Sequence, residues 1–156
     1  MKKAPYRAFR FVHPEADAGL AATARTPATA DAGHGLGIAP TGGIEMAEGH
    51  ESVRQAILLL LSTIPGERVM RPDYGCDLFR LIFSPNDDAT AGLAIHFVRR
   101  AIQRWEPRVD VLFLDANRDE LRPWVLDILL RYRVRSTQRV EEFHVPVDLA
   151  GESAVH

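Results

Sequence analysis

The sequence AIQRWEPRVDVLFL, residues 101–114, contains the point at which the chain changes from helical to strand periodicity. Before Pro107, apolar residues recur at helical spacing and form a wide face made of Leu93, Ala94, Phe97, Val98, Ala101, Ile102 and Trp105. Pro107 ends this helix because proline has no amide hydrogen to donate. After it the period becomes two, with Val109, Val111 and Phe113 on one side and Asp110, Leu112 and Leu114 on the other. A helix therefore ends at this junction and a sheet begins.

Two further helices are expected before residue 86. The apolar residues of 51–62 lie at helical spacing and predict an amphipathic helix that Pro65-Gly66 ends. Residues 67–72 read as an extended segment. Asp77 is then expected to cap a short helix over 78–83, and Asn86-Asp87-Asp88 to cap the helix that leads to Trp105.

Two more strands are expected after the junction. In residues 124–134 the alternate positions Trp124, Leu126, Ile128, Leu130, Tyr132 and Val134 share one face. A polar turn at 136–139 separates this segment from a last strand over 140–147. Helices followed by strands with short turns favour an α+β fold, with three helices packed on a small antiparallel sheet of three to four strands.

The first 49 residues differ in composition from the rest. Tyr6 to Val12 can pair as a short strand, whereas residues 14–49 are dominated by Ala, Gly, Thr and Pro and bury too little apolar surface to form a core. Within them, 37–46 carries a Gly-Gly pair that suits a hairpin turn. We therefore expect an extended N-terminal arm and linker over 1–49, one domain over 50–147 and a flexible tail over 148–156.

Composition limits the function classes. The chain has 156 residues, 46% of them hydrophobic, which is enough for one core. Its formal net charge of -2 gives no overall field for nucleic acid or anionic membrane. The single cysteine, Cys76, excludes an intrachain disulfide and suits a reducing cytosol, and no signal sequence or membrane-spanning run is expected.

Three features are candidates for binding a partner. Glu106 and Arg108 flank Pro107, so two opposite charges are held on a restricted backbone and can contact a partner. The alternative to a binding role is an ordinary surface ion pair, which contributes only about 0–1 kcal/mol to stability. The loop 63–76, which includes Arg68, either presents a binding surface or rigidly connects two helices. A basic stripe, made of Arg131, Arg133 and Arg135, lies on one strand face and suits an acidic protein better than nucleic acid, although such stripes are also found as solvated faces.

Catalysis has little support in the sequence. The six histidines are scattered without metal-binding spacing, and the glycines of 33–43 do not match a phosphate-binding loop. Glu106 has no evident carboxylate companion for glycoside hydrolysis. We therefore expect no cofactor, no metal ion and no enzymatic activity.

Four segments together resemble one known family. They are Pro65-Gly66-Glu67-Arg68, Arg71-Pro72-Asp73-Tyr74-Gly75-Cys76, Phe83-Ser84-Pro85-Asn86 and Trp105-Glu106-Pro107-Arg108. Their order and spacing are similar to those of the baseplate wedge family of contractile tails, which includes the phage W-type protein and the type VI secretion subunit TssE. The resemblance covers about residues 35 to 147.

The resemblance implies a structural, noncatalytic baseplate subunit of a phage tail, type VI system or other contractile injection system, present in sixfold copies. Its implied partners are wedge proteins and the sheath subunit, whose first ring it would template, with spike or hub proteins through the N-terminal arm. It implies assembly in the bacterial cytoplasm and carries Glu106, Pro107 and Arg108 over as the family motif; the roles of Arg68 and the basic stripe are extrapolated. Two alternatives stay open, a peptidoglycan hydrolase and a free regulatory adaptor of the same fold.

Overall fold

The structure is a computed structural model that describes residues 7–9, 11–12, 35–36, 40–42 and 46–151. The chain divides into two compact units, residues 1–55 and 56–156. In the first unit, β1 (Arg7–Phe9) pairs antiparallel with β4 (Met46–Glu48), and β2 (Phe11–Val12) pairs with β3 (Gly35–Leu36). Most of the hairpin expected over 37–46, and most of the N-terminal arm, lie outside the described residues.

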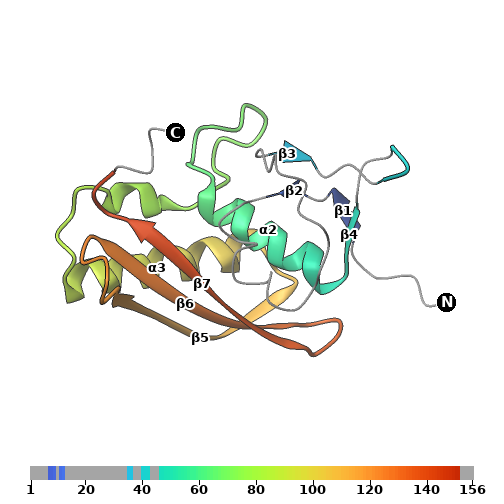
Figure 1. The fold of residues 1–156 in the computed structure, drawn as a ribbon. Helices are drawn as coiled ribbons and strands as arrows, with labels where there is room; N and C mark the ends of the chain where they lie inside the picture. The colour runs from blue at the N-terminus through green and yellow to red at the C-terminus, as the bar shows by residue number, and fades with distance from the viewer. Residues whose placement is uncertain (1–6, 10, 13–34, 37–39, 43–45, 152–156) are drawn as a thin grey trace. The chain divides into compact units, whose positions relative to one another are not determined.

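The second unit holds the sheet that the sequence predicted. After α2 (His50–Ser62), which crosses the boundary between the units, come η1 (Asp77–Leu81) and α3 (Asp88–Trp105). The strands β5 (Val109–Arg118), β6 (Val125–Val134) and β7 (Val140–Asp148) follow. They form an antiparallel sheet in the order β5-β6-β7 (Figure 1), so the α+β class is confirmed.

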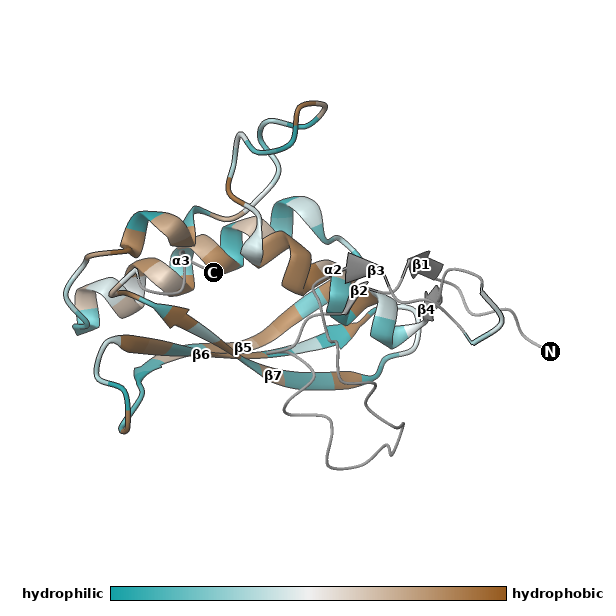
Figure 2. Cartoon of the chain, turned by 45° about the horizontal axis from the view of Figure 1, so that its top comes forward, coloured by the Kyte–Doolittle hydropathy of each residue, from teal (hydrophilic) through white to brown (hydrophobic). Residues whose placement is uncertain are grey.

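The core of this unit lies between α3 and the sheet, where α3 contacts β5 and β6. The helix contributes Ala94, Val98, Ala101 and Ile102. The central strand contributes Leu126, Ile128, Leu130, Tyr132 and Val134, each at most 1% exposed. Figure 2 shows brown segments on the helix and on the strands of this unit. The predicted faces are therefore confirmed, except that Leu93 and Trp124 are each 49% exposed.

The expected short helix over 78–83 is wrong in type and extent. Residues 77–81 form a 3-10 helix, and the residue that caps its start is Cys76, which makes no side-chain capping hydrogen bond. Asp77 is therefore the first helical residue and not the cap. The described residues contain two α-helices, not three. Five residues are too few for a stable α-helix without other support, and such short pieces commonly take the tighter form.

The alternation expected along β5 is interrupted. The register with β6 shifts between Val111 and Phe113, which marks a bulge. One extra residue in a strand moves the following side chains to the other face. Phe113 is consequently 44% exposed, whereas Leu114 and Ala116 face the core. The sequence placed Phe113 on the same side of the strand as Val109 and Val111. That assignment is wrong for Phe113, because the bulge lies between Val111 and Phe113.

The start of α3 is fixed by polar side chains. Asp87 caps the helix by accepting a hydrogen bond of 2.8 Å from the Thr90 amide, as the sequence indicated. This bond lowers the pKa of Asp87. Asn86 donates to the carbonyl oxygens of Pro123 and Val125, at 2.8 and 3.0 Å. Asn86 therefore ties the beginning of α3 to the beginning of β6.

Candidate functional site

The junction after α3 is held by a buried ion pair. Glu106 caps the end of the helix, and its amide donates to the Ile102 carbonyl at 2.8 Å. Its carboxylate accepts two hydrogen bonds from Arg108, from Nε at 2.5 Å and from Nη2 at 2.6 Å. The Glu106 side chain is 6% exposed and that of Arg108 is 29% exposed. The pair is therefore not an ordinary surface ion pair, which was the alternative left open by the sequence. Pro107, which lies between the two charged residues, is exposed.

The loop 63–76 is closed at its base and at its middle. The Cys76 amide donates to the Thr63 carbonyl at 2.9 Å, and the Gly66 amide donates to the Pro72 carbonyl at 2.7 Å. Gly75 has a φ of +136°, and a Cβ there would lie 2.4 Å from the Thr63 carbonyl oxygen. Only glycine fits this position. The loop is thus a defined structural element and not a loose connection.

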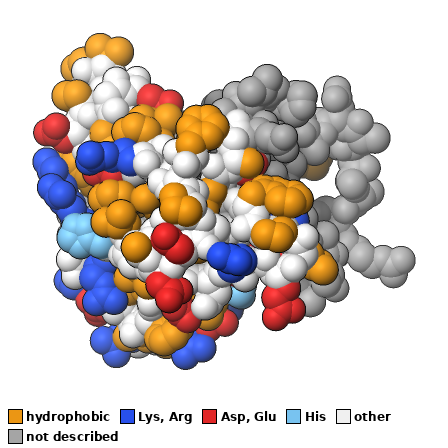
Figure 3. All heavy atoms as spheres, turned by 90° about the vertical axis from the view of Figure 1, so that its left-hand side faces the viewer, with side chains coloured by type: hydrophobic (Ala, Val, Ile, Leu, Met, Phe, Trp, Pro, Cys, Tyr) orange, Lys and Arg blue, Asp and Glu red, His pale blue; other side chains and the backbone are white. Residues whose placement is uncertain are grey.

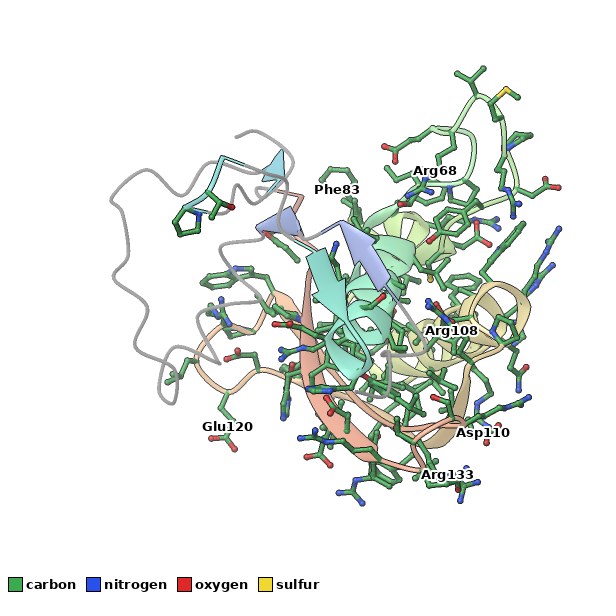
Figure 4. All side chains as sticks on the ribbon, turned by 90° about the vertical axis from the view of Figure 1, so that its right-hand side faces the viewer. Arg68, Phe83, Arg108, Asp110, Glu120 and Arg133 are labelled. Carbon is green, nitrogen blue, oxygen red and sulfur yellow. The ribbon has the colours of Figure 1, made fainter. Side chains whose placement is uncertain are left out.

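Aromatic contacts join this loop to the junction. The Tyr74 ring lies 5.4 Å from the Trp105 ring, and the Arg68 guanidinium carbon lies 4.1 Å from the centre of the Tyr74 ring. Burial raises the pKa of Tyr74, Glu106 raises it further, and the nearby Arg68 and Arg108 oppose this rise. Figure 4 shows Arg68 and Arg108 on the same side of the unit. The structure therefore brings together two candidates that are far apart in sequence.

We call this set the junction surface: Arg68, Tyr74, Trp105, Glu106, Pro107 and Arg108. Beside it is a pocket of about 160 Å³ that Asp73, Cys76, Arg100 and Arg104 help to line. Arg104 pairs with Asp73 at 3.5 Å and lies over the Trp105 ring. Burial raises the pKa of the Cys76 thiol to about 11, so the cysteine is a packed residue and a poor nucleophile.

The arginines of the predicted basic stripe all take part in ion pairs. Arg131 pairs with Glu142 at 2.6 Å, and both Arg133 and Arg135 pair with Asp110. Figure 4 shows Asp110 and Arg133 close together on the sheet. A hydrogen bond from Arg135 is the main cause of a lowered pKa of Asp110. Arg131 and Arg133 lie on β6 and Arg135 follows in the turn, and the two carboxylates of Glu142 and Asp110 offset part of their positive charge.

Three strongly exposed apolar residues were not among the predicted site residues, although Phe83 belongs to one of the family segments and the other two lie in the loop 63–76. Val69 and Met70, in the middle of the loop, are 93% and 92% exposed, and Phe83 is 82% exposed. Figure 3 shows hydrophobic side chains at several places on this face, including its upper left. The sequence feature that indicates this exposed tip is a Val-Met pair between two arginines, in a loop bounded by Pro65 and Pro72.

The described residues hold no group of three or more His, Cys, Asp or Glu side chains placed to bind a metal ion. None of their helices is long and apolar enough to cross a membrane.

The family described as "Baseplate wedge protein gp25" matches residues 47–139, more than half of the chain. The baseplate wedge protein gp25 of Enterobacteria phage T4 is 31% identical over 68 residues, which are 44% of this chain and 52% of that protein. The chain thus spans about half the length of the curated relative it matches.

Solved structures are similar as well. The crystal structure of a putative tail lysozyme from Geobacter sulfurreducens is 36% identical, with a TM-score of 0.62, over 68% of this chain and 96% of that one. A chain of the anti-feeding prophage baseplate has a TM-score of 0.53 at 22% identity, over 76% of this chain and 86% of that one, and supports the fold alone. By the match over residues 47–139, the chain belongs to the family of the baseplate wedge protein gp25.

Proposed function

We propose that this chain is a structural subunit of the baseplate of a contractile tail or injection system. The observation that carries the proposal is the family match over residues 47–139, which includes both the loop 63–76 and the whole junction surface. The chain would assemble in the bacterial cytoplasm with other baseplate proteins, in sixfold copies, before it becomes part of the particle.

The proposed contact with wedge proteins is the junction surface. Arg68 lies over the Tyr74 ring, Arg108 lowers the pKa of the same tyrosine through its charge, and Pro107 is exposed between the paired charges. Tyrosine, tryptophan and arginine are the residue types that most often dominate binding energy at interfaces. Glu106 contributes indirectly, because its buried carboxylate fixes the orientation of Arg108.

The proposed contact with the sheath subunit is an edge of the sheet. Among the described residues, the order β5-β6-β7 gives each outer strand one paired neighbour. Unpaired amide and carbonyl groups along such an edge can accept a strand from another chain. The bulge in β5 disturbs one edge, whereas β7 pairs with β6 in a continuous register. A strand of the first sheath ring would add to one of these edges.

Co-expression with the wedge and sheath proteins tests this assignment. Arg68→Ala and Arg108→Lys should each reduce the amount of wedge complex recovered. Arg68→Ala removes a cation, and Arg108→Lys removes the two-point hydrogen bonding of the guanidinium group. The matched control is Arg131→Ala, which removes an arginine from an exposed ion pair on the sheet. Equal recovery of all variants, with normal sheath length, would contradict the role of the junction surface.

The name of the Geobacter relative favours one rival, a peptidoglycan hydrolase. Glu106 is the candidate acid in that case, but both of its oxygens already accept hydrogen bonds from Arg108. Purified cell walls incubated with the wild-type chain and with Glu106→Gln should show no clearing for either protein. Robust clearing that depends on Glu106 would favour the hydrolase instead.

A further inference from the structure

The tip of the loop 63–76 carries two apolar side chains that are not buried in the core. Val69 and Met70 are 93% and 92% exposed, and their burial would remove most of two apolar side chains from water. Figure 2 shows brown at the tip of this loop, which extends away from α2 and η1. Neither residue belongs to the junction surface. Val69 and Met70 therefore lie outside the core of the unit.

The geometry of the loop keeps this tip in place. Besides the two closing hydrogen bonds, the Arg71 amide donates to the Arg68 carbonyl and the Tyr74 amide donates to the Arg71 carbonyl, both at 3.1 Å. The Glu67 carboxylate accepts from the Ile64 amide at 3.0 Å. Arg68 is turned back onto Tyr74. These contacts hold the backbone on both sides of Val69 and Met70, so little conformational entropy remains to be lost when the tip is buried.

The charges around the tip favour a protein over a lipid surface. The segment 67–73 carries Glu67 and Asp73 as well as Arg68 and Arg71, which gives a formal charge of zero. A loop that enters an anionic bilayer is helped by a local excess of cations, which is absent here. Arg71 is exposed and makes no ion pair with a described residue. A cleft that receives the tip would therefore be apolar inside, with a carboxylate at its rim.

We propose that Val69 and Met70 form an apolar anchor that inserts into a hydrophobic cleft with an acidic rim on a neighbouring baseplate protein. This inference rests on the proposed function, because it takes the partner to be one of the wedge proteins. The loop stacks on the junction surface through Tyr74 and Trp105, so one partner can contact both. The anchor would supply apolar burial, and the junction surface would supply orientation.

The test compares apolar loop residues of similar exposure in the full chain. The double variant Val69→Ser, Met70→Ser removes the anchor. Leu121→Ser is the matched control, because Leu121 is 89% exposed and lies between β5 and β6. Both variants should melt at the wild-type temperature, since neither alters a buried residue. Binding of each purified chain to the co-expressed wedge proteins is then measured, and a photo-reactive amino acid at position 70 or 121 reports contact directly.

We expect the double variant to bind the wedge proteins at least about tenfold more weakly, as loss of an interface anchor does. Leu121→Ser should bind like the wild type, and cross-links should form from position 70 and not from 121. Arg71→Glu should also weaken binding, by at least about threefold, in a manner reduced by salt.

The outcomes separate this inference from the proposed function. If the wild type binds the wedge proteins and the double variant binds equally well, the anchor is refuted and the proposed function stands. If the wild type binds none of them, both fail. Binding of the wild type to vesicles of phosphatidylethanolamine and phosphatidylglycerol, lost in the double variant, would show a membrane as the occupant and would overturn the proposal.

Discussion

Replacing Glu106 with Gln tests whether the buried ion pair holds the helix-to-strand junction together. The carboxylate is 6% exposed and accepts two hydrogen bonds from Arg108, at 2.5 and 2.6 Å. In glutamine the side-chain nitrogen faces one of the two guanidinium donors. At least one hydrogen bond is lost, and Arg108 loses its counter-charge.

The expected cost follows from the burial of the two partners. Breaking a fully buried ion pair costs about 3–5 kcal/mol, and a hydrogen bond to a charged group contributes about 1.5–3 kcal/mol. The Arg108 side chain is 29% exposed, so water replaces part of the lost interaction. We therefore expect the free energy of unfolding to fall by about 2 kcal/mol. For a unit of this size the melting temperature falls by about 10 °C.

A double-mutant cycle measures the pair without its surroundings. Arg108 makes further interactions, so Arg108→Gln alone is expected to cost more than the pair does. Urea unfolding followed by circular dichroism gives the free energy of unfolding for the wild type, Glu106→Gln, Arg108→Gln and the double variant. The coupling energy should be about 1.5 kcal/mol, within the usual range for contacting residues.

The structural role of the pair is refuted if Glu106→Gln changes the free energy of unfolding by less than about 0.5 kcal/mol and the coupling energy is near zero. Glu106 would then have no structural role at the junction, and its carboxylate would be free to serve a partner. The binding experiments on the junction surface depend on this result, because a variant that unfolds loses every interface at once.

Three further predictions concern the same unit. Gly75→Ala should destabilise it by about 2 kcal/mol or more, measured by urea unfolding, whereas Gly66→Ala should cost less because the space around Gly66 is open. Alkylation of Cys76 by iodoacetamide at pH 8, followed by mass spectrometry, should be more than about 100-fold slower in the folded chain than in urea, and equal rates would contradict its burial. Because the pKa of Asp110 is lowered, its ion pair with Arg135 stabilises the fold above about pH 4, and this stabilisation is lost as the pH falls through the folded pKa. Asp110→Asn should therefore reduce the pH dependence of the free energy of unfolding. An unchanged pH profile would refute the pairing.

The parts of the fold that the sequence predicted are those set by long periodic patterns. The apolar spacing of α3 and the alternation of β6 extend over 18 and 10 residues, so their faces were assigned correctly. The 3-10 helix spans five residues, too few for the period to distinguish it from an α-helix. The bulge in β5 depends on how that strand meets β6, which alternation within one strand does not record.

The candidate site shows the same division between local and long-range information. The position of Glu106 and Arg108 around Pro107 is local and was found from the sequence. Burial of the Glu106 carboxylate, and the approach of Arg68 through Tyr74, depend on a loop that begins more than 30 residues earlier. No spacing rule relates these positions, so their association is visible only in the folded chain.

The register of the sheet also decides which charges a partner can use. Arg131 lies directly opposite Glu142 on β7, and Arg133 lies directly opposite Asp110 on β5. Opposite charges in such cross-strand pairs satisfy each other, and a partner that bound them would first have to break those contacts. No such cost applies at the tip of the loop 63–76, where two exposed apolar side chains gain by leaving water. The free energy for docking is therefore more readily supplied by the loop than by the strand arginines, even though the arginines are the more conspicuous feature of the sequence.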